Sequence, residues 1–527
     1  MSQASSERWP NWWQPIASLW GIVLIYAVYG LVNSVISLAD GVAIAHDDAK
    51  LNVLTQHFSA QYLPDNPPLY EWILFLVQMI TGPSLISFLI VKYALFTLMG
   101  VGTFLALRAI IANQQTGTAA SGQGPAIAND PGAIAAFAAI GLLALYQIGW
   151  NAHQAFTHSL ALMAVVPFFV WRVACLVHRR SLINYCGAGI FAGLGMLSKY
   201  SFVATLLVVV LAVATDKRAR EKISTQWLAL SILCFALIMG PHAIAVLMNS
   251  LSDTHSLLQD RFGAEASWFA RVLAGLPAAL WAAVTFFAPF ALIALFLRAP
   301  RRAVSDIAGA GWAGRLFLSG FIVLIAFVVV MGAKDFAERY AIAFLLPAYL
   351  GLIVLLARHE LPALKQKRLL FILCAMVLAN PAFRLVPVIK PGPPFCGNCA
   401  QWVPFEHLTD EISTSIEADM TLVGFDAQTA GNLRRAFARN RVVSSHLPDY
   451  WPPVAGKKSP ACKFIWSPDL SPPPPAEVLA SFSSYQQRTI TASWSVPGRQ
   501  KDWRQTSWHV VDIPTDNYAY SVLCFAS

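Results

Sequence analysis

The sequence predicts an α-helical polytopic membrane protein that ends in a small α/β domain. Two observations predict the membrane part: 57% of the 527 residues are hydrophobic and 12% are charged, and the mean hydropathy is +0.55. Soluble domains carry about 25% charged residues, so most of this chain must lie in lipid. A third observation, the change to ordinary polarity after Lys390, predicts the terminal domain.

Apolar runs of roughly 17–25 residues predict membrane-spanning helices, and about 11 such runs can be placed on this chain. They lie near residues 18–38, 85–107, 133–149, 157–177, 185–198, 201–215, 226–247, 274–297, 316–332, 340–357 and 369–389. The expected organisation is therefore a membrane domain over residues 1–390 and a second domain over residues 391–527.

The distribution of basic residues predicts the orientation in the membrane. If the first polar loop lies outside, the inside loops hold most of the arginines and lysines, including the run 217–222 and the pair Arg301 and Arg302. This arrangement satisfies the positive-inside rule, and it makes residues 43–74 extracytoplasmic. The net charge of +9 comes largely from residues at the ends of apolar runs. It therefore indicates contact with membrane lipids, and we expect no nucleic-acid partner.

The tail reads as a series of strands and helices. "MTLVGFD" is typical of a buried strand, "AQTAGNLRRAFARN" of a helix, and "RVVSSHL" of a second strand. The further strand candidates are "CKFIWS", "RTITASW", "WHVVDI" and "YAYSVLCFA". By the span count, this small α/β domain lies on the extracytoplasmic side.

Four cysteines of the tail predict disulfide bonds, because an even set of extracytoplasmic cysteines is usually oxidised. They are Cys396, Cys399, Cys462 and Cys524, and their pairing stays open. The alternative for "CGNC", a redox or zinc motif, lacks the second close pair that a zinc site would need. The other cysteines lie in or beside the spans and are expected to be packing residues. They are Cys175, Cys186, Cys234 and Cys374.

The passage from residue 43 to residue 74 carries more ionisable residues than a connector needs. Asp47 and Asp48 follow the first span directly, Lys50 comes next, and Asp65 precedes a proline pair in "YLPDNPPLYEW". The helix expected over "LYEWILFLVQMITG" carries polar side chains that are poor choices for lipid tails. We therefore expect it to lie at the membrane interface.

Three motifs in this order resemble the polyprenyl-phosphate sugar glycosyltransferases related to protein O-mannosyltransferases and to the lipid A aminoarabinose transferase. This is glycosyltransferase family 39, whose multi-span fold is called GT-C. The first motif is the acidic pair followed by "YLPDNPPLYEW". The second, "GIFAGLGMLSKYSF" (189–202), is similar to a span that ends in a Ser/Thr-Lys pair. The third, "KDFAERYAIAFLLPAYLGL" (334–352), is similar to a basic-aromatic loop before a helix that contains Leu-Pro. The resemblance covers residues 15–390, approximately, and not the tail.

The resemblance implies a role for each of these residues. Asp47 is the implied general base, Asp48 its acidic neighbour, and Lys199 the lysine that neutralises the lipid phosphate. The implied substrate-binding residues are Lys50, Asp65, His158, Lys199, Tyr200, Arg339 and Tyr340. His158 stands where an aspartate is common in the family.

Elementary chemistry agrees with residues of these types at the outer ends of spans. The implied donor is a sugar linked through phosphate to an isoprenoid chain buried in the bilayer. Transfer needs a base that takes the proton of the acceptor hydroxyl, and cations that stabilise the phosphate as it leaves. Because a lipid phosphate reaches only the membrane interface, both kinds of group are expected there.

Structural roles stay open for the same residues. An aspartate at a span end can stabilise a helix N-terminus, and Asp65 can initiate a turn before the proline pair. Lys199 can extend its ammonium group to the interface, and Arg339 with Tyr340 can anchor the interfacial aromatic belt. The histidines do not form a metal-binding motif, so a metal is left unassigned.

The leading hypothesis is an inverting glycosyltransferase with a polyprenyl-phosphate sugar donor. The preferred acceptor is a glycolipid of the bacterial envelope, such as lipid A or the core region of lipopolysaccharide. The expected location is the bacterial inner membrane, with the tail in the periplasm. The alternatives are a protein O-glycosyltransferase, a transporter or flippase of lipid-linked sugar, and an inactive scaffold. A transporter would place ionisable residues within the spans, where Lys92 is nearly alone.

Overall fold

The structure is a computed structural model of the chain. It describes residues 12–41, 43–121, 130–154, 157–249, 267–297, 311–334, 336–357, 363–390, 399–453, 461–481, 486–495, 503–514 and 524. The chain divides into two compact units. The first, here named the helical unit, is formed by Met1–Gly30, Pro64–Leu69 and Tyr93–Asn380. The second, here named the mixed unit, is formed by Leu31–Leu63, Tyr70–Lys92 and Pro381–Ser527. We describe each unit by itself.

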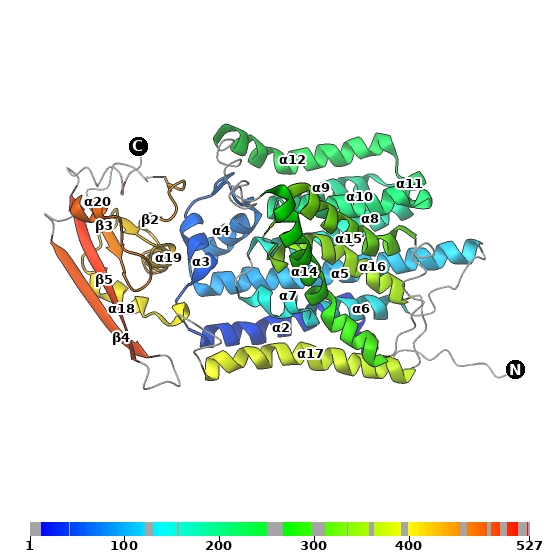
Figure 1. The fold of residues 1–527 in the computed structure, drawn as a ribbon, viewed down its shortest axis with the longest axis horizontal. Coiled ribbons are helices and arrows are strands. Elements are labelled where there is room, and N and C mark those ends of the chain that lie inside the picture. Colours follow the sequence, from blue (N-terminus) through cyan, green and yellow to red (C-terminus); the bar gives the residue numbers. More distant parts are fainter. Residues whose placement is uncertain are drawn as a thin grey trace. The chain divides into compact units, whose positions relative to one another are not determined.

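The described part of the helical unit is built from helices (Figure 1). Three of its helices continue into the mixed unit: α2 (Leu19–Ala39), α5 (Leu85–Ser121) and α17 (Ala363–Ile389). The others are α1 (Trp13–Ile16), α6 (Pro131–Gly141), η1 (Leu142–Ala144), α7 (Tyr146–Gly149), η2 (Asn151–His153), α8 (His158–His178), α9 (Leu182–Ser198), α10 (Phe202–Thr215), α11 (Lys217–Lys222), α12 (Thr225–Asn249), α14 (Trp268–Leu297), α15 (Gly311–Met331), η4 (Glu338–Tyr340) and α16 (Ile342–Ala357).

The protein is a multi-pass membrane protein. Within the described residues, seven helices are long and apolar enough to cross a membrane, or eight if one bent pair forms a single span. A helix coincides with every apolar run that the sequence predicts as a span. Three of these helices, α9, α10 and α16, are shorter, with 17, 14 and 16 residues. The helices are confirmed, and a total of about 11 crossings stays a prediction.

Close packing between helices accounts for the small residues in the spans. Helices α8, α9, α10, α15 and α16 pack against one another in neighbouring pairs. At Gly351 of α16, a Cβ atom would lie 2.5 Å from the backbone nitrogen of Phe317 in α15. No side chain fits at that distance, so glycine permits the two helix backbones to approach.

The bent pair is broken between η1 and α7, with an angle of 64° between its two halves. Buried hydrogen bonds hold the end of this broken segment. The His153 ring accepts or donates at both nitrogens: Nε2 lies 2.9 Å from the Tyr29 hydroxyl, and Nδ1 lies 3.1 Å from the Tyr93 hydroxyl. The ring of Phe96 stacks on His153 at 4.9 Å. Because buried polar groups need hydrogen-bond partners, these contacts fix the position of His153 at the end of the broken segment.

The mixed unit contains two short helices of the first polar loop and the C-terminal domain. The two helices are α3 (His46–Leu54) and α4 (Leu69–Thr81). The domain has η5 (Ala400–Trp402), α18 (Phe405–Ser413), β1 (Thr421–Gly424), α19 (Ala427–Ala436), β2 (Arg441–Ser444), β3 (Ala461–Trp466), α20 (Ala476–Ser481), β4 (Gln487–Ser495) and β5 (Trp503–Pro514).

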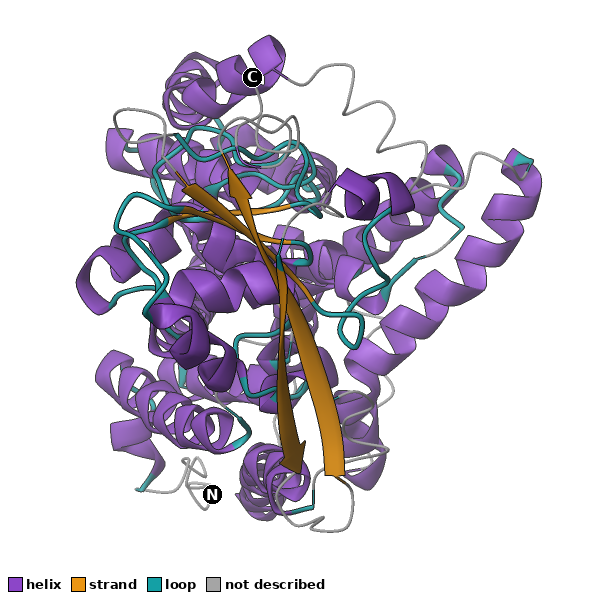
Figure 2. Cartoon of the chain, turned by 90° about the vertical axis from the view of Figure 1, so that its left-hand side faces the viewer, coloured by secondary structure: helices purple, strands orange, loops and turns teal. Residues whose placement is uncertain are grey.

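The sheet of the domain has the strand order β2-β1-β3-β5-β4, and Figure 2 shows it in orange. Strands β2, β1 and β3 run parallel, whereas β5 is antiparallel to both β3 and β4. The strands predicted over "MTLVGFD", "RVVSSHL", "CKFIWS", "RTITASW" and "WHVVDI" are confirmed, and so is the helix between the first two. The candidate "YAYSVLCFA" lies outside the described residues apart from Cys524.

The two faces of the sheet bury different sets of side chains, as the alternation along a strand requires. One face carries a hydrophobic cluster that includes Phe464, Val511 and Cys524. On the other face, Trp508 is fully buried and its ring lies 5.7 Å from the ring of Phe405 in α18. The predicted α/β domain therefore has a hydrophobic core of its own.

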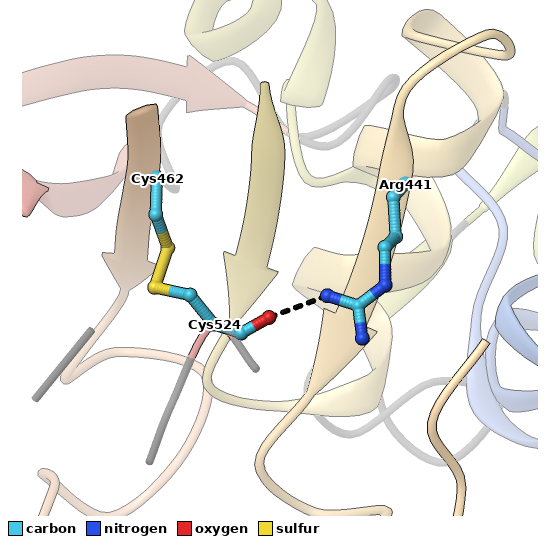
Figure 3. The surroundings of a disulfide bond; sticks show 3 residues. All are labelled: Arg441, Cys462 and Cys524. Carbon is cyan, nitrogen blue, oxygen red and sulfur yellow. Dashed lines mark hydrogen bonds between the residues drawn. A yellow bond between two sulfur atoms is a disulfide. The ribbon is translucent and has the colours of Figure 1, made fainter. Parts of the chain in front are cut away.

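A disulfide bond joins Cys462 of β3 to Cys524 (Figure 3). The guanidinium group of Arg441 donates a hydrogen bond to the backbone carbonyl of Cys524, so Cys524 has two attachments, one to β3 and one to β2. Cys399 is also disulfide-bonded, and Cys396 lies outside the described residues. The four cysteines expected to be packing residues have free thiols; three of them are partly buried, and Cys374 is exposed.

Candidate functional site

The acidic pair lies in the first turn of α3. The helix begins after Ala45, whose backbone is extended and whose side chain provides no cap. Carboxylates at this position are favourable because the N-terminus of a helix carries a partial positive charge. Asp47 is exposed and Asp48 is half-buried. The carboxylate of Asp47 is therefore accessible at the surface of the mixed unit, whereas that of Asp48 is partly covered by the unit.

Asp48 belongs to a cluster of ionisable groups within the mixed unit. Its carboxylate interacts electrostatically with the ammonium group of Lys92 in α5. It also interacts with the hydroxyl of Tyr70, as does the carboxylate of Glu71. Lys92, Tyr70 and Glu71 are all at most 5% exposed. Since buried charges are stabilised by opposite charges nearby, the carboxylate of Asp48 favours the charged form of Lys92.

A second cluster lies in the helical unit around Lys199. Helix α9 ends at Ser198, and the backbone of Lys199 is extended. The Lys199 ammonium group donates a hydrogen bond of 2.8 Å to Oγ of Ser159. It also lies 5.1 Å from the centre of the Tyr340 ring, within the range of a cation–π interaction. Helices α8 and α9 and the short helix η4 therefore meet at this lysine.

The segment η4 brings a second cation to the same ring. The guanidinium group of Arg339 lies 5.6 Å from the centre of the Tyr340 ring, and its side chain is exposed. Glu338, the first residue of η4, accepts a hydrogen bond from the side-chain amide of Gln147 in α7. Asn151 donates to Oε1 of Gln147 at 2.9 Å. These bonds fix η4 against the broken segment, and two positive charges gather around one aromatic ring.

Tyr200 follows Lys199 and makes a separate contact. Its hydroxyl lies 2.9 Å from Nε2 of His242 in α12. Burial, and then the negative charge of Asp65, raises the pKa of Tyr200 to about 12. The phenol is therefore neutral at physiological pH and able to donate a hydrogen bond. Asp65 lies near enough to Tyr200 to influence it electrostatically.

The structure describes every predicted catalytic and substrate-binding residue. In the helical unit it brings together Lys199, Arg339 and Tyr340, with Tyr200 and Asp65 beside them. His158 is buried at the start of α8, where its Nδ1 lies 3.1 Å from the Thr157 hydroxyl. In the mixed unit, α3 carries Asp47, Asp48 and Lys50. The functional roles of these residues stay predictions.

Several polar residues of these clusters were not among the predicted site residues. Ser159, the partner of Lys199, follows His158 directly in "FTHS" and could have been noticed for that reason. Gln147 is an isolated polar residue in an apolar run and is 1% exposed. An amide at such a position must find a partner, which is the one signal that pointed to a bond with another segment.

A resident metal is not assigned. Among the residues that the structure describes, no three His, Cys, Asp or Glu side chains form a group that could hold a metal ion.

Comparison with known proteins finds relatives over most of the chain. A family model described as "Dolichyl-phosphate-mannose-protein mannosyltransferase" matches residues 129–244. The chain is 27% identical over 455 residues to the lipopolysaccharide core galacturonosyltransferase RgtA of Rhizobium johnstonii, covering 84% of this chain and 86% of the relative. It is 25% identical over 451 residues to RgtB of the same organism, covering 83% of this chain and 85% of the relative.

The fold is similar to that of a solved structure. ArnT from Cupriavidus metallidurans, in a crystal structure bound to undecaprenyl phosphate, matches with a TM-score of 0.56 and 15% identity. The match covers 93% of this chain and 98% of ArnT. The apo state of ArnT matches with a TM-score of 0.52 and 14% identity. At these identities the likeness concerns the fold, and it confirms the GT-C architecture that the sequence predicts.

Proposed function

We propose, on the premise that this chain is a family 39-like glycosyltransferase of the GT-C type, that it moves a sugar from a polyprenyl phosphate to a glycolipid of the bacterial envelope. The transfer inverts the configuration at the anomeric carbon and takes place on the extracytoplasmic side of the inner membrane. The C-terminal domain lies on that side, in the periplasm.

One observation carries this proposal: Lys199 and Arg339 both lie against the ring of Tyr340. Two like charges close together repel each other, and an anion between them removes the repulsion. A residue that only anchors a span end to the interface needs no second cation. A phosphate that carries negative charge before and after the sugar leaves suits two cations better than one.

The reaction forms one bond and breaks one. The oxygen of the acceptor hydroxyl attacks the anomeric carbon, and a bond between them forms. The bond between that carbon and the donor phosphate oxygen breaks, and its electron pair leaves with the polyprenyl phosphate. The proton of the hydroxyl goes to the carboxylate of Asp47. Charge that develops on the leaving phosphate is stabilised by Lys199 and Arg339.

The environments of the two aspartates support Asp47 as the base. Asp48 is half-buried and interacts electrostatically with Lys92 and Tyr70. Its carboxylate therefore already has a positively charged neighbour within the mixed unit. Asp47 is exposed at the same helix end and is accessible to an incoming hydroxyl. A base must come within about 2.6–3.2 Å of the proton that it takes, which an exposed side chain permits.

The relatives suggest the acceptor and the sugar. Both curated relatives are named as lipopolysaccharide core galacturonosyltransferases, and each match covers more than four fifths of both chains. We therefore propose the core region of lipopolysaccharide as the acceptor and a uronic acid, galacturonic acid first, as the sugar. The match to a protein mannosyltransferase family supports a second candidate, transfer to a protein hydroxyl.

Envelope glycolipids from a deletion strain test this proposal. Their masses should lack a uronic acid residue that reappears when the intact gene is supplied. The Asp47→Asn variant, produced at the same level, should not restore it. Unchanged glycolipid masses in the deletion strain, together with a sugar missing from envelope proteins, would refute the glycolipid acceptor in favour of the protein one.

A further inference from the structure

The short helix α3 has little stability of its own. It has nine residues, and Ala45 at its N-cap makes no side-chain hydrogen bond to the helix. Isolated helices shorter than about 12–15 residues are marginal in water. The place of α3, and with it the place of Asp47, must therefore be fixed by neighbouring elements of the mixed unit.

Asn432 of α19 holds the chain just before α3. Its Oδ1 accepts a hydrogen bond of 3.0 Å from the backbone N–H of Ile44, and its Nδ2 donates one of 2.8 Å to the carbonyl of Ile44. Nδ2 also donates to the carbonyl of Gln428 at 2.9 Å. Asn432 is 2% exposed. The side-chain amide of Asn432 thus both accepts from and donates to the backbone of Ile44, as the backbone of a neighbouring strand would.

Gln56 makes the same kind of pairing beyond the other end of α3. Its Oε1 accepts a bond of 2.8 Å from the backbone N–H of Val442 in β2, and its Nε2 donates one of 2.6 Å to the carbonyl of Val442. The hydroxyl of Tyr450 donates to the carbonyl of Leu54, the last residue of α3, at 2.5 Å. Both ends of the helix are therefore attached to the C-terminal domain.

Between these ends, the backbones of α3 and α19 are in contact. A Cβ atom at Gly431 would lie 2.5 Å from the carbonyl oxygen of Ala49 and 2.7 Å from its Cα. Asn52 donates a bond of 2.8 Å to the carbonyl of Gly431 and accepts one of 2.8 Å from Gln78 of α4. Ala49 and Asn52 are fully buried. Nothing larger than glycine fits at residue 431 unless α3 moves.

We propose that Asn432 and Gln56 are positioning residues for Asp47, so that the C-terminal domain fixes the acidic turn of α3 for the transfer reaction. The inference rests on the proposed function, in which Asp47 takes the proton of the acceptor. A displacement of about 1 Å in a catalytic group can cost 10²-fold in rate. Loss of Asn432 removes its hydrogen bonds to Ile44 before α3, and loss of Gln56 leaves the Tyr450 bond to Leu54 as the remaining hydrogen bond described at the other end. The carboxylate of Asp47 then samples positions that are unproductive.

Variants of the full-length protein test this inference. Asn432→Ala and Gln56→Ala should each lower kcat at least tenfold, with the KM for the polyprenyl-phosphate sugar within twofold of wild type. Hydrogen exchange supplies a readout that needs no activity. The backbone amides of residues 46–54 should exchange at least tenfold faster in both variants, while those of α8 and α9 stay unchanged.

Asn440→Ala is the matched control. Asn440 is 8% exposed in the same domain, and its Nδ2 donates to the carbonyls of Glu417 and Met420 at 2.7 Å and 3.0 Å. This variant should lower the unfolding temperature as Asn432→Ala does, but leave kcat and the exchange of residues 46–54 within twofold of wild type. Gln56→Ala lies outside the domain and keeps the test valid if Asn432→Ala fails to fold.

The outcomes separate this inference from the function on which it rests. Equal kcat in Asn440→Ala and in the two test variants would overturn the positioning role. Unchanged exchange of residues 46–54 in both test variants would overturn the attachment of α3. Absence of transfer by the wild-type protein overturns the proposed function, and this inference with it, before any variant is compared.

Discussion

The ammonium group of Lys199 lies 5.1 Å from the centre of the Tyr340 ring and donates a hydrogen bond of 2.8 Å to Ser159. The guanidinium group of Arg339 approaches the same ring at 5.6 Å. The two cations come from segments that are far apart in the sequence, and the ring holds both by cation–π attraction. This arrangement leads to the first prediction.

Replacement of Lys199 should weaken donor binding and slow transfer, because the phosphate is charged in the ground state and in the transition state. In Lys199→Ala we expect kcat/KM to fall roughly 10²-fold. Lys199→Arg should keep part of the activity, since the charge remains but the geometry changes. Steady-state kinetics with a polyprenyl-phosphate sugar measures both. Lys217→Ala, at a side chain that is 81% exposed, is the control and should match wild type. Wild-type kinetics in Lys199→Ala would leave only an interfacial role for this lysine.

The hydrogen bond from Gln147 to Glu338 should affect donor binding indirectly, because it fixes the segment η4 that carries Arg339 and Tyr340. Glu338→Ala leaves the buried amide of Gln147 without its acceptor, at a cost of about 1–3 kcal/mol, and releases the segment that carries Arg339 and Tyr340. We expect a lower unfolding temperature together with a higher KM for the donor. Glu338→Gln retains an acceptor oxygen and should lose less. Donor KM at the wild-type value in Glu338→Ala would show that other contacts hold η4.

His57 should make the attachment of α3 sensitive to acid. Its Nδ1 lies 3.0 Å from the Tyr450 hydroxyl, and its ring stacks on the Tyr450 ring at 5.6 Å. Burial lowers the pKa of His57 below its ordinary value. The unfolded state therefore binds more protons than the folded state below about pH 6.5. The stability that this contact contributes is complete above about pH 6.5 and is lost as the pH falls through the lowered pKa.

Unfolding temperatures measured between about pH 5 and 8 check this dependence, since a histidine titrates in that range. His57→Phe should reduce the loss of stability on acidification, because the aromatic stacking remains and the titrating group is gone. An identical acid dependence in wild type and in His57→Phe would assign it to another group.

The disulfide between Cys462 and Cys524 should be present in the protein as isolated and should stabilise the C-terminal domain. Thiol reagents should modify these two cysteines only after reduction. Replacement of both cysteines by serine should cost about 2–5 kcal/mol of domain stability. Cys186→Ser, at a free thiol, is the control. Modification of Cys462 in the unreduced protein would contradict the bond.

The sequence predicted the elements of the fold well because their signals are local. An apolar run long enough to cross a bilayer indicates a helix without further information. Strands such as "RVVSSHL" and "WHVVDI" show β-branched and aromatic residues in short runs. The strand order β2-β1-β3-β5-β4 could not be predicted, since it depends on pairing between segments that the chain brings together only on folding.

The candidate site was predictable as a set of residues and not as an arrangement. Lys199, Arg339 and Tyr340 were found because each belongs to a motif, but no local signal shows that both cations share one ring. The attachment of α3 was missed for the same reason, because Asn432 lies 388 positions from Ile44. An asparagine inside a polar helix looks like any surface residue until its partner is known.

The most direct test of the account is the turnover of Asp47→Asn in a purified system. The assay contains the protein, an undecaprenyl-phosphate-linked galacturonic acid and a lipopolysaccharide core acceptor, and mass spectrometry follows the product. The substitution keeps the size and polarity of the side chain and removes the proton acceptor. Turnover should therefore fall by roughly 10²-fold or more while binding of the donor lipid stays at the wild-type level. Turnover by Asp47→Asn equal to that of the wild-type protein would contradict the account.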